Sequence, residues 1–340
     1  MNNSPTIAVI IPSNHAHADL LKIVMAVCLQ TVKPTEIIIV DSFVDNAFCP
    51  TGIVNFCSLW GVKLIYEHPK LALPGQARNI GLCLAKAELV AFIDVQTIPR
   101  PDWLEVSLKV LTNNNVAGVY GSTSFSAETW LERLIRDAFF GILPRKTLPG
   151  SIFRRDVLNK SGHFIDWVRA GEDTEWMLRL KLLKIPVASL PEALVDYEGL
   201  IGMDLNSIMK KWHRNYSASH ELPHLFPQKL FLWMVLYPLI IFVGFNWNYL
   251  IANWHEDSPF YIAHITKIAA IFPLFAYIIT RGVLLPIRRG VSFSNLFPVR
   301  FFFLAGLCFL ADFAKFLAFS ASIGNKASIS HSNKYKKVNL

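Results

Sequence analysis

The sequence predicts an α/β head followed by a helical membrane region, because the apolar residues change their pattern along the 340-residue chain. Up to about residue 228, short β-branched runs alternate with segments whose apolar residues recur at helical spacing. Such alternation is typical of a parallel sheet with helices packed against it. From about residue 229 the chain is nearly continuously apolar, in stretches about as long as a bilayer requires.

The head begins with buried strands that each stop at a polar or turn-forming residue. Thr6–Ile11 is a β-branched run closed by Pro12, Glu36–Val40 ends in Asp41, and a run at residues 89–93 stops at Asp94. Further strands are expected at residues 61–68 and 116–120 and within 150–164, and helices at residues 20–29, 74–87, 127–140 and from 171 onward. Side chains that follow buried parallel strands usually line a ligand crevice, so these strand ends are candidate binding positions.

Residues 199–228 predict a basic amphipathic helix just ahead of the membrane region. Apolar side chains recur there at helical spacing, while the opposite side carries Lys210, Lys211, His213 and Arg214. A helix of this kind is expected to lie in the membrane interface, where its basic side chains meet anionic lipid. An ordinary surface helix of the head is the alternative.

Three apolar segments follow. Leu230–Ala252 has no charged residue and is expected to span the membrane. Phe260–Leu285 is a second expected span whose Lys267 and Arg281 need to lie near an interface. The third segment, Phe297–Ser322, is expected either to span or to lie in the interface. Its two charged residues, at positions 312 and 315, are spaced to meet on one helical face.

The distribution of Lys and Arg predicts the orientation. The loop "NWHEDSP" after the first span has neither residue, whereas Arg288 and Arg289 follow the second span. The positive-inside rule therefore places the head in the cytoplasm, attached to the inner or plasma membrane as a multi-pass protein. A third span would put the lysines of the polar basic tail outside, so two or three membrane helices remain open for residues 229–322, with the tail at 323–340.

Composition excludes several classes of protein. The formal net charge is +8, but no block of Lys and Arg interleaved with aromatic residues occurs in the head, so a nucleic-acid partner is not expected. Membrane lipids or a phosphorylated substrate account better for the basic balance. The five cysteines form no C-x-x-C pair, which argues against a zinc site and a disulfide framework and for a reduced, cytosolic head.

Five blocks of the head together carry a family resemblance. The segments "VIIPSNH", "IIIVDS", "PGQARNIGL", "VAFIDVQTIPRPDWLE" and "RAGEDTEWMLRL" follow one another in the order of the family 2 glycosyltransferases, which the sequence resembles over about residues 6–185. The resemblance implies the GT-A fold, a Rossmann-like nucleotide-diphospho-sugar transferase fold, for residues 1–198. It also implies an enzyme that transfers a sugar from a nucleotide-sugar donor, with UDP as the expected nucleotide.

The resemblance assigns donor contacts to the ends of the first two strands and to the helix after the third. Pro12 and Ser13 match the loop that holds the nucleoside, and Asp41 matches the acid after the second strand. Such an acid can accept a hydrogen bond from ribose hydroxyls or a base N–H, or merely cap the next turn. Arg78 lies near the start of a helix, where the family places a residue close to the diphosphate; a surface salt bridge is the alternative.

The metal-binding motif of the family is altered in this chain. Asp94 and Gln96 occupy the positions of the D-x-D motif, in which carboxylates hold Mg²⁺ or Mn²⁺ against the diphosphate. Gln96 offers only a neutral carbonyl oxygen, so the affinity for a divalent cation is expected to fall. His213 is a candidate further ligand, although an exposed histidine near an interface is more often only solvated.

The resemblance also assigns the catalytic base. An inverting transfer needs a carboxylate that takes the proton of the acceptor hydroxyl. Asp173 inherits this role and Glu172 is the reserve, while both could serve only to stabilise the first turn of their helix. The predicted function is therefore a membrane-anchored inverting glycosyltransferase acting on a lipid-linked or cell-envelope glycan. A processive polysaccharide synthase subunit and a non-catalytic relative that binds nucleotide-sugar are the alternatives.

Overall fold

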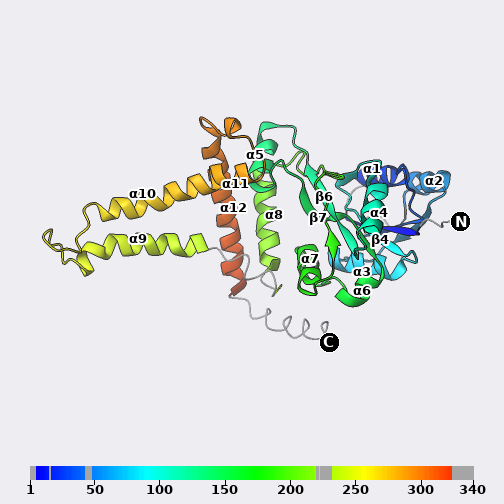
Figure 1. Cartoon of the computed structure of the whole chain (residues 1–340), viewed down its shortest axis with the longest axis horizontal. Helices are drawn as coiled ribbons and strands as arrows, with labels where there is room; N and C mark the ends of the chain where they lie inside the picture. Colours follow the sequence, from blue (N-terminus) through cyan, green and yellow to red (C-terminus); the bar gives the residue numbers. More distant parts are fainter. Residues whose placement is uncertain (1–4, 15–16, 43–47, 220–221, 223–231, 324–340) are drawn as a thin grey trace.

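The computed structural model describes residues 5–14, 17–42, 48–219, 222 and 232–323. The basic tail from residue 324 and the start of the first expected span, at residues 230–231, lie outside these described residues. Figure 1 shows the sheet-containing head at one end, a pair of long helices projecting at the other end, and a group of helices between them.

One mixed sheet forms the centre of the head. Its strands are β1 (Ile7–Ser13), β2 (Glu36–Asp41), β3 (Lys63–Glu67), β4 (Leu89–Phe92), β5 (Thr97–Pro99), β6 (Gly118–Phe125), β7 (Arg145–Arg154), β8 (Val187–Ala188) and β9 (Val195–Tyr197). They run in the order β3-β2-β1-β4-β7-β6-β9-β5, with β8 paired to β6. The prediction of parallel strands is confirmed for β3, β2, β1 and β4. The strand expected within residues 150–164 corresponds to the end of β7, which runs antiparallel to both β4 and β6 and makes the sheet mixed.

Helices cover both faces of this sheet, which explains why its strands read as continuous apolar runs. The helices of the head are α1 (His17–Cys28), α2 (Thr51–Leu59), α3 (Pro74–Leu84), α4 (Trp103–Asn113), α5 (Trp130–Phe139), α6 (Asp156–Ser161) and α7 (Glu172–Leu182). Alternate residues of β1 enter different core clusters: Val9 packs with α1 and α4, whereas Ile10 packs with α3 and α7. A strand buried on both faces has no polar position, so the period-2 pattern disappears.

The next group of helices joins the head to the apolar tail. It contains α5, α8 (Leu205–Ser219) and α12 (Arg300–Ile323), which share one buried cluster. The apolar face of α8, including Ile208 and Trp212, packs into this cluster. Asp137 of α5 forms an ion pair with Arg300 at the start of α12, with 2.7 Å between Asp137 Oδ2 and Arg300 Nη2. The apolar face of α8 is thus used for packing within the protein, and its location in a membrane interface stays a prediction.

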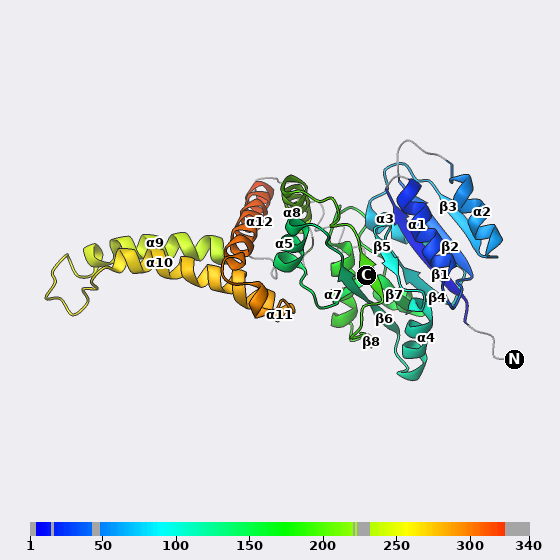
Figure 2. The same ribbon diagram turned by 90° about the horizontal axis from the view of Figure 1, so that it is seen from above.

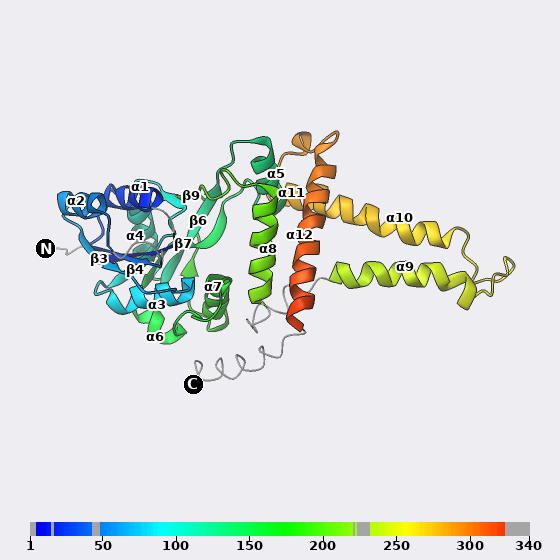
Figure 3. The same cartoon turned by 180° about the vertical axis from the view of Figure 1, so that it is seen from behind.

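The remaining helices form a hairpin. Its arms are α9 (Leu232–Leu250) and a continuous stretch made of α10 (Ile265–Ile278), a π-helical turn (Ile279–Leu284) and α11 (Leu285–Arg288). Figures 2 and 3 show α9 and α10 side by side, directed away from the sheet, while α12 runs across the base of the hairpin beside α8. The two arms pack closely at Gly244, where there is no room for a side chain: a Cβ at this position would lie 2.1 Å from the Cβ of Ala269.

Two helical stretches of the described residues are long and apolar enough to cross a membrane. They are Ile265–Arg288, which is mostly exposed, and Arg300–Ala318, half of which is buried within the protein. The first corresponds to the second expected span, with its helix beginning at residue 265 instead of 260. The second corresponds to the segment that the sequence left open between spanning and interfacial.

The charges of these helices pair with one another. Lys315 contacts Asp312 at 3.0 Å, which confirms that the two residues meet on one face of α12. Asp312 also pairs with Arg281 of the hairpin and accepts a hydrogen bond from the Tyr277 hydroxyl at 3.2 Å. From the sequence, Arg281 was expected to lie near a membrane interface. In the structure its charge is paired with the carboxylate of Asp312 on a neighbouring helix.

Candidate active site

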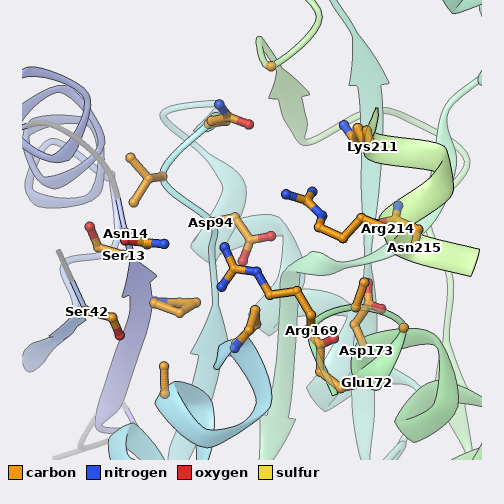
Figure 4. A pocket seen from close by; sticks show the side chains of 18 of the residues that line it. Ser13, Asn14, Ser42, Asp94, Arg169, Glu172, Asp173, Lys211, Arg214 and Asn215 are labelled. Atoms are coloured by element: carbon orange, nitrogen blue, oxygen red, sulfur yellow. The ribbon is translucent and has the colours of Figure 1, made fainter. Parts of the chain in front are cut away.

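A cavity of about 850 Å³ opens between the carboxyl ends of the parallel strands and the helices α7 and α8. Its wall includes Pro12, Ser13, Asn14, Ser42, Arg78, Asp94, Gln96, Arg169, Glu172, Asp173, Tyr197, Lys210, Lys211, Arg214 and Asn215. Figure 4 shows the labelled side chains of Ser13, Asn14 and Ser42 on one side of the cavity and those of Arg169, Lys211, Arg214 and Asn215 on the other. All five sequence blocks contribute to this wall, and the block "IIIVDS" does so through Ser42, which follows Asp41.

Arg78 is a buried clamp between two carboxylates. Its Nη1 lies 2.5 Å from Glu172 Oε1 and its Nη2 lies 3.0 Å from Asp94 Oδ1. Burial lowers the pKa of Arg78, but the carboxylates of Asp94, Glu172 and Asp173 outweigh burial and raise it above the usual value. Gly75 lies one turn earlier in α3. It allows α3 to approach the backbone at Ile165, because a Cβ at position 75 would lie 1.9 Å from the carbonyl oxygen of Ile165. Arg78 thus forms salt bridges, but they are buried and not on the surface, and its contact with the diphosphate stays a prediction.

Glu172 and Asp173 begin α7 but occupy different surroundings. Glu172 is buried against Arg78; burial raises its pKa to about 7, the Arg78 guanidinium opposes this shift, and the Asp173 carboxylate adds to it. Asp173 is half-buried on the cavity wall (Figure 4) and accepts hydrogen bonds from the backbone N–H and the hydroxyl of Thr174, at 2.6 and 3.2 Å. Among the residues that the structure describes, Asp173 forms no ion pair within 4.0 Å.

Gln96 is held by a hydrogen-bond chain that reaches α8. Lys211 Nζ donates to Tyr197 Oη at 3.1 Å, and Tyr197 Oη donates to Gln96 Oε1 at 3.2 Å. Pairing of Thr97 with Tyr197, between β5 and β9, brings these groups together. Gly199 is required beside them, because a Cβ there would lie 2.4 Å from Tyr197 Oη and 2.5 Å from Gln96 Oε1. Tyr197 could not be predicted from the sequence, because the three-residue strand β9 is too short to show a periodic pattern.

The donor atoms in this part of the cavity do not fit a divalent cation. A hard cation such as Mg²⁺ or Mn²⁺ requires several oxygen ligands, preferably carboxylates. The Asp94 carboxylate is paired with Arg78, and the Gln96 carbonyl accepts from Tyr197. In the described part of the chain, no group of three or more His, Cys, Asp or Glu side chains could hold a metal ion.

Two residues predicted from the sequence lie outside the cavity wall. Asp41 is buried and accepts a hydrogen bond from the Tyr66 hydroxyl at 3.0 Å, while its neighbour Ser42 lines the cavity. His213 is exposed on α8 and is absent from the lining residues. The structure therefore brings together Pro12, Ser13, Arg78, Asp94, Gln96, Glu172 and Asp173, and it separates Asp41 and His213 from them.

Arg169 and Arg214 line the cavity but were not predicted from the sequence as individual ligands. Both side chains extend into the cavity from the side of α7 and α8 (Figure 4). Partial burial lowers the pKa of Arg214, and the positive charge of Arg169 lowers it further. The only sequence signal is their place: Arg169 directly precedes the "AGED" segment, and Arg214 follows the basic run of α8.

Comparison with known proteins identifies the class of this fold and site. The model of the glycosyl transferase family 2 matches residues 8–171. These residues include β1 to β7 and the clamp made by Arg78 and Asp94, and they end immediately before Glu172. Residues 8–171 therefore form a glycosyl transferase family 2 domain, and the resemblance seen in the sequence is confirmed for this part of the chain.

Two curated relatives match the head. An uncharacterized glycosyltransferase of Rickettsia conorii is 26% identical over 181 residues, which cover 50% of this chain and 29% of the relative. The pre-mycofactocin glycosyltransferase of Mycobacterium tuberculosis is 26% identical over 207 residues, covering 56% of this chain and 42% of the relative. The chain thus spans less than half the length of the curated relatives that it matches.

A solved structure shows the same fold. The mannosyltransferase PcManGT from Pyrobaculum calidifontis, solved with GDP-Man and Mn²⁺, superposes with a TM-score of 0.56 at 14% sequence identity. The similarity covers 96% of this chain and 89% of PcManGT. The GT-A fold class predicted from the sequence is therefore confirmed.

Proposed function

We propose that the chain is a membrane-anchored inverting glycosyltransferase that transfers a sugar from a nucleotide-diphospho-sugar, with UDP as the expected nucleotide, to a lipid-linked or cell-envelope glycan acceptor. The observation that carries this proposal is the different bonding of the two adjacent carboxylates. Glu172 is tied to Arg78, whereas Asp173 faces the cavity without an ion pair among the described residues. A general base must be able to receive a proton, and Asp173 meets this requirement better than Glu172.

The roles of the remaining cavity residues follow from their positions. Ser13, Asn14 and Ser42 lie at the ends of β1 and β2, where polar groups can hold the nucleoside. Arg78 fixes Asp94 on one side and Glu172 on the other, so the donor side and the acceptor side of the cavity share one rigid clamp. Preorganised groups of this kind contribute to catalysis because they do not have to reorient during the reaction.

The apolar helices support the anchoring and the type of acceptor. The hairpin of α9 and α10 exposes large apolar side chains, among them Phe242, Phe245, Phe272 and Phe275. The α9 arm has 19 residues, about 28 Å of helix, which is close to the thickness of the hydrocarbon core. With the hairpin across the bilayer, α12 and α8 would lie along its surface and hold the cavity near lipid-linked acceptors.

A substitution at Asp173 tests the proposal in the purified full chain. Asp173→Asn should bind donor nucleotide within about twofold of the wild type and lose at least about a hundredfold in turnover, the usual cost of losing a positioned base. Asp166→Asn, at an exposed position outside the cavity wall, is the matched control and should keep its turnover. Turnover is measured as release of free nucleotide, and lipid-linked glycans from cells with and without the gene identify the acceptor by mass spectrometry.

Two results would count against the proposal. Near-wild-type turnover in Asp173→Asn would mean that another group takes the proton. Absence of nucleotide release by the wild type with every donor and membrane extract supplied would favour the non-catalytic relative instead.

A further inference from the structure

Two arginines of the cavity wall, Arg169 just before α7 and Arg214 on α8, are not paired with a carboxylate of any described residue. Arg169 and Arg214 form no ion pair within 4.0 Å with any residue that the structure describes. Both side chains extend into the cavity (Figure 4), and partial burial, followed by the positive charge of Arg169, lowers the pKa of Arg214. Arginine remains charged under all physiological conditions, so these groups repel each other unless an anion lies between them.

Two lysines extend this positive surface along α8. Lys210 and Lys211 both line the cavity, and Lys211 donates to Tyr197. Through Tyr197, the ammonium group of Lys211 is linked to Gln96, the residue at the second position of the altered D-x-D motif. The ammonium group of Lys211 is therefore linked by hydrogen bonds to position 96, where the family pattern has a metal-binding carboxylate. The second carboxylate of the motif is missing, and a protein cation is linked to its position through Tyr197.

We propose that Arg169, Arg214 and Lys211 neutralise the diphosphate of the sugar donor in place of a divalent cation. This inference rests on the proposed function and goes beyond it by assigning how the leaving group is stabilised. Guanidinium groups bind phosphate oxygens in a bidentate manner, and the flexible ammonium of Lys211 adds a further donor. The opposite wall, with Ser13, Asn14 and Ser42, is then left for the nucleoside.

The reaction itself is balanced by groups on the cavity wall. The bond between the anomeric carbon and the phosphate oxygen breaks, and its electron pair leaves with the nucleoside diphosphate. The acceptor oxygen forms the new bond to the anomeric carbon, and its proton passes to Asp173. The negative charge that develops on the leaving diphosphate meets the positive groups of Arg169, Arg214 and Lys211, which are already in place.

Binding measurements on the full chain test this assignment without turnover. UDP, GDP and inorganic pyrophosphate are titrated by calorimetry in excess EDTA and again in Mn²⁺, and Mn²⁺ is titrated alone. We expect saturable binding of at least one nucleotide in EDTA, with an affinity that Mn²⁺ changes less than about threefold. Arg169→Met and Arg214→Met should each weaken this binding about tenfold or more, as expected for a lost charge-assisted hydrogen bond.

A matched control separates local from general effects of charge. Arg100→Met removes an exposed guanidinium that pairs with Asp102 on the surface, outside the cavity wall, and should leave the nucleotide affinity unchanged. Circular dichroism of each variant shows whether it is folded. Lys211→Met provides a second, independent loss of positive charge from a different part of α8.

Several outcomes would overturn the inference. Loss of all nucleotide binding in EDTA with recovery in Mn²⁺ would show that a divalent cation is required. Unchanged nucleotide affinity in Arg169→Met and Arg214→Met, with a raised KM for the acceptor alone, would assign the arginines to an acceptor phosphate. A chain that binds nucleotide in EDTA through these residues but transfers no sugar would support this inference and contradict the proposed function.

Discussion

Glu172 and Asp173 are neighbours in the chain, yet the fold places them in different surroundings. The first turn of α7 directs Glu172 into the protein, onto Arg78, and leaves Asp173 on the cavity wall. The sequence could identify the acidic pair by its resemblance to a family motif. It could not assign the partner of each carboxylate, because Arg78 lies 94 positions from Glu172 and their contact depends on the packing of α3 against α7.

The raised pKa of Glu172 predicts a pH dependence of stability. Burial raises this pKa to about 7 from 4.5, so the folded protein binds a proton more readily than the unfolded chain does. The contribution of Glu172 to stability is therefore fully present below pH 4.5 and is lost as the pH rises through 7. Relative to Glu172→Gln, the free energy of unfolding of the wild type should fall by about 3 kcal/mol across this window.

The measurement is denaturant unfolding of both proteins in detergent between pH 4 and pH 9. The comparison with Glu172→Gln removes the titration of all other groups, which the two proteins share. A stability difference that stays constant over the whole range would mean that Glu172 titrates alike in the folded and unfolded chains.

At the scale of elements, α8 connects the cavity to the apolar helices. One side of α8 carries Lys211 and Arg214, which line the cavity, and the other side carries Trp212 and Tyr216. The ammonium group of Lys315, on α12, lies 4.5 Å from the ring centroid of Trp212 and 5.0 Å from that of Tyr216. The packing of α12 therefore determines where the cationic side of α8 stands relative to the donor.

This arrangement predicts that a change in α12 weakens donor binding from a distance. Lys315→Met removes a buried ion pair and three cation–π contacts, and should lower the free energy of unfolding by about 2 kcal/mol. Hydrogen exchange in residues 205–219 should become faster, and nucleotide affinity should fall. Lys267→Met, at an exposed position of α10, is the matched control and should change neither. Unchanged exchange in α8 would show that α12 does not hold it.

The elements that the sequence could predict are those that carry their own pattern. The strands β1, β2 and β4 are uniformly buried runs, and the contact between Asp312 and Lys315 depends only on helical spacing. By contrast, β5 and β9 have three residues each and exist because they pair with one another. The ion pair between Arg281 and Asp312 joins residues 31 positions apart on different helices, so no local pattern could indicate it.

At the scale of the whole molecule, the basic end of the hairpin and the head lie on the same side. The backbone carbonyl of Arg289 accepts hydrogen bonds from the N–H groups of Ile142 and Leu143 in the head, at 2.9 and 3.1 Å. The loop at the far end of the hairpin, residues 251–264, contains neither Lys nor Arg. Arg288 and Arg289 thus lie beside the head while the far loop has no basic residue, the asymmetry that the positive-inside rule associates with a cytoplasmic head.

Labelling of cysteines in intact cells tests this orientation with the full chain. Cys83 is exposed on the head, and Glu256 is exposed in the far loop of the hairpin. A maleimide that cannot cross membranes should label Glu256→Cys in intact cells, whereas Cys83 should react only after the membrane is opened, because the bilayer shields a cytoplasmic domain. Cys83→Ser in the wild type measures background labelling of the other cysteines. Cys83→Ser combined with Glu256→Cys ensures that labelling of the second protein does not come from Cys83. Labelling of Cys83 from outside, with protection of the cysteine at position 256, would place the cavity on the outer side of the membrane. The cavity would then have no access to the cytoplasmic nucleotide-sugars on which the proposed reaction depends.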